Sequence, residues 1–205
     1  MYLVKTPAIL KPLAKDFVWK IDTSKKIIYL TFDDGPTPEV TEKVLSILKE
    51  YNAKATFFCL GKNVEEHPEL YLEVLNARHT TGSHSYSHKD GWKTNNYSYI
   101  KDALRGNQKI NSTLFRPPYG HITLSQTSSL KKRFKLIMWD VISGDFDKTI
   151  SAEKCLQNVI NNTEAGSIVV FHDSVKAAEK MLQVLPQVLK HYGDLGFKFE
   201  ALSIV

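Results

Sequence analysis

Residues 27–36 read Ile-Ile-Tyr-Leu-Thr-Phe-Asp-Asp-Gly-Pro, and this stretch combines the two features that organise the whole chain. Its first six residues form an apolar, β-branched and aromatic run, which is typical of a buried strand. Two carboxylates, Asp33 and Asp34, follow at once, and a Gly-Pro pair then turns the chain. We therefore predict a buried strand that ends on two acidic side chains.

Similar runs recur along the chain and alternate with amphipathic helical patterns. The predicted strands are 27–32, 55–60, 136–142, 167–171 and 197–203, with weaker candidates at 79–83 and 113–116. The predicted helices are 39–51, 68–78, 97–111, 123–133, 151–162 and 175–192. Thr37 is expected to cap the first helix, with Pro38 at its first position. Alternating strands and helices predict parallel βα units, in either a doubly wound sheet or a barrel.

Composition and charge describe an ordinary globular protein. The 205 residues favour a single domain, and 42% apolar with 24% charged residues is close to the average for soluble domains. The net charge of +5 is spread along the chain, with Lys131-Lys-Arg133 as the one tight basic cluster. We read it as solubility charge and expect no nucleic-acid partner.

Two features bear on the compartment. Cys59 and Cys155 have neither metal-ligand nor redox-motif spacing, so we predict free core thiols. The first 12 residues lack a basic segment followed by a continuous apolar stretch, and no run is long enough to span a bilayer. The expectation is therefore a cytoplasmic protein without a membrane span.

Polar residues follow several predicted strands directly. They are Asp33 with Asp34, His84, Arg116 and His172. Because α/β folds assemble active sites at the carboxyl ends of parallel strands, we predict an active site there.

The histidine pair in His84-Ser-Tyr-Ser-His88 adds a metal to this prediction. Imidazoles four residues apart can face one side of a turn, and with one carboxylate they form a His₂-Asp set with open positions, as in catalytic metal sites. Each of these segments on its own has an ordinary structural interpretation. The Asp-Asp-Gly-Pro segment could be a solvated turn, Arg116-Pro-Pro a rigid loop, and His172 a structural histidine.

Taken together, five segments resemble the polysaccharide deacetylase family, also known as the NodB homology or carbohydrate esterase family 4 group. They are TFDDG at 31–35, HSYSH at 84–88, RPPYG at 116–120, WDVISGDF at 139–146 and FHD at 171–173. The resemblance implies a distorted, incomplete (β/α)7 barrel of the TIM type. It covers a predicted domain at 27–205, with residues 1–26 as a lead-in segment that packs on the barrel.

The resemblance also implies roles for the first motifs. Asp34, His84 and His88 would bind a divalent metal, most often Zn²⁺, with Co²⁺, Ni²⁺, Fe²⁺ or Mn²⁺ as alternatives. Asp33 would be the general base that takes a proton from metal-bound water. Arg116 would pair with Asp33 and keep it ionised and oriented.

The later motifs supply the remaining roles by the same resemblance. The backbone N–H of Tyr119 would stabilise the oxyanion, and His172 would be the general acid, oriented by Asp145. Trp139 and Phe146 would contact the substrate.

The fourth motif departs from the family pattern of DxxDW, because Ile142 and Phe146 replace its first acid and its tryptophan. This departure puts the substrate specificity in doubt, while the acid that orients the histidine is retained. In the segment 89–99, Trp92 or Tyr97 could stack on a sugar, although covering the helices of the barrel is the more ordinary role.

The implied activity is the hydrolysis of N-acetyl or O-acetyl groups on a carbohydrate. Two alternatives are a C–N hydrolase that acts on a small cyclic amide and a non-catalytic carbohydrate-binding module. The complete Asp-Asp and His-x₃-His set argues against both, and the oligomeric state stays open.

Overall fold

The computed structural model describes residues 3–7 and 15–203; residues 1–2 and 8–14 of the predicted lead-in and 204–205 of the predicted domain lie outside the described residues. Its centre is a curled sheet. The strands are β1 (Phe17–Val18), β2 (Ile27–Asp33), β3 (Ala55–Cys59), β4 (Thr80–Ser83), β5 (Leu114–Phe115), β6 (Lys135–Ile137), β7 (Val141–Ile142), β8 (Ile168–His172) and β9 (Lys198–Phe199). They run in the order β1-β6-β5-β4-β3-β2-β8-β7, β9 pairs with β2, and every pair of these strands is parallel.

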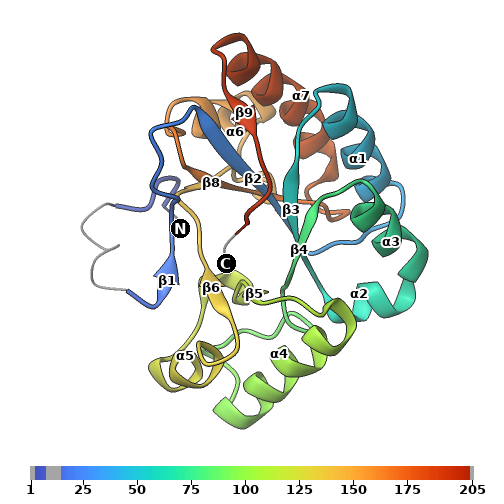
Figure 1. The fold of residues 1–205 in the computed structure, drawn as a ribbon, viewed down its shortest axis with the longest axis vertical. Helices are drawn as coiled ribbons and strands as arrows, with labels where there is room; N and C mark the ends of the chain where they lie inside the picture. The colour runs from blue at the N-terminus through green and yellow to red at the C-terminus, as the bar shows by residue number, and fades with distance from the viewer. Residues whose placement is uncertain (1–2, 8–14, 204–205) are drawn as a thin grey trace.

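Helices lie around the outside of this sheet (Figure 1). They are α1 (Val40–Glu50), α2 (Gly61–Glu66), α3 (Pro68–Asn76), α4 (Asn96–Ile110), α5 (Leu124–Leu130), α6 (Ala152–Ile160) and α7 (Ala178–Asp194). The sheet curls without closing, so the described chain forms the expected incomplete (β/α) barrel. That prediction of the fold is confirmed.

The core forms where β2, the longest of the described strands, meets its neighbours. All seven residues of β2 are buried, and Phe32 stacks on Phe57 of β3 and Phe171 of β8 at centroid distances of 5.1 and 6.0 Å. Outside the sheet, α1 turns Val44 and Leu48 inward at a spacing of four residues. The central strand, its two neighbouring strands and α1 therefore share one core cluster.

Two local predictions differ from the structure, and one helix was not predicted. The run 136–142 forms two strands, β6 and β7, with Met138–Asp140 between them. Thr37 does not cap α1, which begins at Val40 after Glu39, a residue in the left-handed region at φ 65°. The Thr37 side chain was expected to cap the helix, but its backbone carbonyl accepts the N–H of Val40 instead. Helix α2 carries no apolar periodicity long enough to predict it.

The described lead-in residues lie against β6 and β7. Phe17 and Val18 of β1 pair with β6, and the N–H of Met138 donates to the Val18 carbonyl. The N–H of Ile142 in β7 donates to the carbonyl of Val4. The interruption between β6 and β7 is thus occupied by backbone from the lead-in, which explains why one apolar run gives two strands.

Cys59 and Cys155 are buried and free, so the prediction for the two thiols is confirmed. None of the helices in the described part of the chain is both long and apolar enough to cross a bilayer.

Candidate active site and metal centre

The carboxyl ends of the strands bring the predicted residues together. Asp33 and His172 are the last residues of β2 and β8 and face each other in register. His84 follows β4, and Arg116 follows β5. A cavity of about 470 Å³ opens here. All the sequence-predicted site residues line it except Arg116 and Asp145, which contact Asp33 and His172 respectively.

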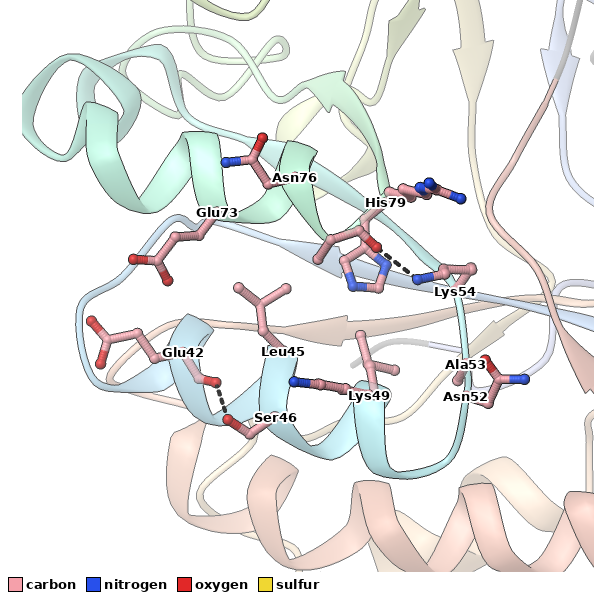
Figure 2. Close-up of a pocket in the computed structure, with 13 residues that line it drawn as sticks. Glu42, Leu45, Ser46, Lys49, Asn52, Ala53, Lys54, Glu73, Asn76 and His79 are labelled. Carbon is pink, nitrogen blue, oxygen red and sulfur yellow. Dashed lines mark hydrogen bonds between the residues drawn. The ribbon is translucent and has the colours of Figure 1, made fainter.

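A larger cavity of about 640 Å³ lies elsewhere, between α1 and α3 (Figure 2). Its lining includes Glu42, Lys49, Glu73 and His79. It lies at the opposite end of the sheet, since Ala53 and Lys54 precede β3 and His79 precedes β4. Cavity size therefore does not locate the site, whereas the convergence of ionisable side chains does.

The three predicted metal ligands converge on one point. The Asp34 Oδ1 atom lies 3.8 Å from His84 Nε2 and 3.2 Å from His88 Nε2, and one ligand atom of each residue lies within 4.8 Å of the others. Asp34 Oδ1 is buried and accepts no hydrogen bond. A buried carboxylate oxygen facing two imidazole nitrogens fits a divalent cation, and a set of three protein ligands leaves positions open for water and substrate.

The imidazole of His84 is oriented for ligation. Its Nδ1 lies 2.8 Å from the carbonyl oxygen of Arg116, which can only accept, so Nδ1 carries the proton and Nε2 presents its lone pair toward Asp34. Burial lowers the pKa of His84 to about 4, which keeps the ring neutral. A neutral, oriented imidazole is the form that binds a metal.

The backbone is in the left-handed region at several points of the site. Asp34, His88 and Tyr119 have φ values of 83°, 58° and 61°. This conformation is uncommon for residues with a side chain and persists where surrounding contacts enforce it. Their clustering here is consistent with a functional centre.

Asp102 of α4 holds the loop that carries the histidines. Its Oδ2 accepts the N–H groups of Tyr86 and Ser87 at 3.2 and 3.0 Å, and its Oδ1 accepts the Ser87 hydroxyl at 2.7 Å. Within the loop, the His88 N–H donates to Ser85 Oγ at 3.0 Å. Asp102 was not predicted from the sequence, because a lone acid in a helical pattern usually lies on the solvated face.

Asp173 holds the acidic loop in a similar way. Its Oδ1 accepts the Gly35 N–H at 3.0 Å, and its Oδ2 accepts the Thr41 hydroxyl at 2.6 Å. Burial raises the pKa of Asp173 to about 8. A Cβ at position 35 would lie 2.0 Å from this carboxylate, so the contact requires glycine. The FHD segment contained this residue, but its role was not predicted.

The predicted base is anchored by a fully buried arginine. Arg116 Nη1 donates to Asp33 Oδ1 at 2.6 Å and to Thr31 Oγ1 at 2.7 Å, while Nη2 donates to the Met138 carbonyl at 2.9 Å. Its guanidinium lies over the Phe58 ring. The arginine both compensates the Asp33 charge and fixes the direction of the carboxylate.

The predicted acid has a carboxylate partner as well. His172 Nδ1 lies 2.8 Å from Asp145 Oδ1, and the His172 backbone N–H donates to Asp145 Oδ2 at 2.7 Å. Burial opposes the imidazolium and is the largest single contribution, but the charge and hydrogen bond of Asp145, with the charges of Asp34 and Asp33, together raise the pKa of His172 to about 9. Asp140, the neighbouring acid, instead accepts from Ser167 and Lys5.

One wall of the cavity is apolar. Ile142, Trp139 and Phe146 line it, and the Phe146 ring meets His172 edge-on at a centroid distance of 5.1 Å. Trp92 and Tyr97 are 65% and 75% exposed, so neither side chain is buried against the helices of the barrel.

Comparison with known proteins agrees with this fold. A family model described as polysaccharide deacetylase matches residues 20–134. A peptidoglycan-N-acetylglucosamine deacetylase of Bacillus cereus is 30% identical over 90% of this chain and 90% of its own length. A second deacetylase of that name and organism is 34% identical over 80% of this chain, and the match covers 64% of that relative.

The crystal structure of a peptidoglycan N-acetylglucosamine deacetylase, bound to 4-naphthalen-1-yl-N-oxidanyl-benzamide, has a TM-score of 0.87. It is 30% identical, and the match covers 96% of this chain and 95% of that one. The chain therefore belongs to the polysaccharide deacetylase family, and the resemblance seen in the sequence motifs is confirmed.

Proposed function

We propose that the protein is a divalent-metal-dependent deacetylase that hydrolyses N-acetyl groups on the sugars of a glycan. The observation that carries this proposal is the buried Asp34 Oδ1, which faces two histidine nitrogens and accepts no hydrogen bond. The names of the relatives point to N-acetylglucosamine in peptidoglycan as the substrate class.

A divalent ion at Asp34, His84 and His88 would supply Lewis acidity, by which it polarises a carbonyl oxygen and acidifies water. Asp33 takes the proton of the attacking water, because its carboxylate is held by Arg116 at the edge of the same cavity. The arginine stays charged throughout and keeps the carboxylate oriented.

His172, which lines the same cavity, completes the proposed hydrolysis. The water oxygen adds to the acetyl carbonyl carbon, and the backbone N–H of Tyr119 stabilises the oxyanion. His172 delivers a proton to the sugar nitrogen as the C–N bond breaks, which yields acetate and a free amine. The apolar wall of Trp139, Ile142 and Phe146 would receive the acetyl methyl group.

Replacement of the base gives a direct test. Asp33→Asn should lower acetate release from N-acetylglucosamine oligosaccharides by about a hundred- to ten-thousand-fold, since no carboxylate accepts the water proton. The bound divalent ion, measured by elemental analysis, should remain because its ligands are intact. His88→Ala should instead lose the ion.

Asp22→Asn, at an exposed acid outside the site, is the matched control and should behave as wild type. Near-normal turnover of Asp33→Asn would show that Asp33 is not the general base. Unchanged metal content in both His84→Ala and His88→Ala would refute the metal site.

A further inference from the structure

A row of aromatic rings leads from the proposed metal ligands toward the surface, and its exposed members are Tyr119 and Trp92. The His88 ring meets Tyr119 edge-on at a centroid distance of 4.5 Å, and Tyr119 lies 5.7 Å from His121. His121 stacks face to face on Trp92 at 3.7 Å with an interplanar angle of 7°. Tyr119 and His121 also line the catalytic cavity. The row therefore connects the reaction centre with a surface beyond it.

Trp92 is held in place although it is exposed. Its indole Nε1–H donates to the Ile122 carbonyl at 3.3 Å, and its backbone N–H donates to Asp90 Oδ1 at 2.9 Å. The same Asp90 oxygen lies 3.0 Å from His121 Nδ1. One carboxylate thus aligns both partners of the stack. With one face on His121 and 65% of the residue exposed, the opposite face of Trp92 is open.

Gly91, which precedes Trp92, allows the backbone of this segment to pass close to His121. A Cβ on Gly91 would lie 2.2 Å from the His121 carbonyl oxygen, so only glycine lets the two segments meet. The Gly91 carbonyl accepts Nε2 of the buried Gln126 at 2.9 Å, and Gln126 also closes the capping box of α5 with Thr123. The tryptophan is therefore preorganised, which reduces the entropy that binding costs.

We propose that the open face of Trp92 is a second sugar subsite, which binds a pyranose next to the residue that is deacetylated. An exposed and immobilised indole offers a flat apolar surface with a polar edge, and a pyranose ring has a matching apolar face. The enzyme should then prefer an oligosaccharide or polysaccharide to a monosaccharide. This inference rests on the proposed function, since it extends the same cavity.

The test compares N-acetylglucosamine with its β-1,4-linked tetramer. With the tetramer, Trp92→Ala should raise KM by on the order of tenfold and leave kcat unchanged, because one central aromatic contact is lost. With the monosaccharide it should match wild type. Trp92→Phe should recover most of the loss. Tyr97→Ala is the matched control, since this exposed aromatic belongs to the same segment but lines a separate pocket on α4.

Calorimetry of tetramer binding to the metal-free protein separates this inference from the proposed function. If the wild type releases no acetate from either sugar, the proposed function is refuted. The subsite is then tested only by the affinity for the tetramer that calorimetry measures. Tetramer binding that weakens in Trp92→Ala and persists in Tyr97→Ala supports it. Equal losses with monosaccharide and tetramer, or tetramer binding that does not depend on Trp92, would overturn it.

Discussion

Each ionisable group that the proposed reaction uses is held by a side chain from another element. Asp33 at the end of β2 is bound by Arg116 after β5, and His172 at the end of β8 by Asp145 after β7. Such partners fix direction and compensate charge, so that both groups are in place before the substrate arrives. Activity should therefore depend on the partners nearly as strongly as on the groups themselves.

The pair of His172 and Asp145 predicts a specific pH dependence. The raised pKa of His172, about 9, keeps the imidazole protonated and able to act as an acid through neutral pH. Asp145→Asn removes the charge that favours the imidazolium, so the pKa should fall and the alkaline limb of the kcat/KM profile should move to lower pH. A bound cation would lower the pKa of His172 in the wild type and in Asp145→Asn alike. The pKa should therefore still be lower in the variant than in the wild type.

Asp147→Asn serves as the matched control for Asp145→Asn, because its carboxylate accepts from the nearby Thr149. Its pH profile should coincide with that of the wild type. An alkaline limb that stays in place in Asp145→Asn but moves in Asp147→Asn would show that the fourth motif is aligned incorrectly.

At the scale of elements, α4 positions the loop that carries two of the proposed metal ligands. Asp102→Ala removes three hydrogen bonds to the backbone and hydroxyl of that loop. Substitution of residues that hold metal ligands in place typically lowers metal affinity by about 10- to 100-fold. We therefore expect zinc affinity to fall by about this factor in Asp102→Ala. Competition with a chromophoric zinc chelator would measure it.

Lys101→Ala, an exposed neighbour on α4, is the matched control and should keep wild-type affinity. Asp102→Asn retains the shape of the side chain. It provides a second test if the alanine variant does not fold. Identical zinc affinity in wild type, Asp102→Asn and Asp102→Ala would show that α4 does not position the ligands.

The sequence predicted strands and helices where apolar periodicity is strong, as in β2 and α1. It could not predict α2, which is short and has only Gly61 and Val64 buried. The sequence also predicted β6 and β7 as a single strand. The residues that separate them form hydrogen bonds with the lead-in, which is far away in the sequence. Motifs identified the residues brought to the cavity, whereas Asp102 and Asp173 emerge only from tertiary contacts that no local pattern encodes.

At the scale of the whole molecule, the lead-in contacts a wall of the proposed active site. The Thr6 hydroxyl donates to the Trp139 carbonyl at 2.8 Å, and the Thr6 N–H donates to the Asp140 carbonyl. Lys5 forms an isolated antiparallel bridge with Val141. We propose that the described lead-in residues, 3–7 and 15–26, are an integral part of the barrel domain rather than an appendage. Its contribution to stability is then measurable through side chains that face the barrel.

Lys5 and Lys20 provide a matched pair for that measurement. Lys5 Nζ donates to Asp140 Oδ2 at 2.9 Å, and Asp140 is fully buried, whereas Lys20 pairs at 2.9 Å with the largely exposed Glu164. Lys5→Met keeps the apolar stem but removes the ammonium from a buried carboxylate. Because Lys5 itself is partly exposed, we expect the free energy of unfolding in urea to fall by about 2 kcal/mol, below the full cost of breaking a buried pair. Lys20→Met should lower it by less than about 1 kcal/mol, since surface pairs contribute little. Equal losses in the two variants would mean that the lead-in lies on the barrel without stabilising it.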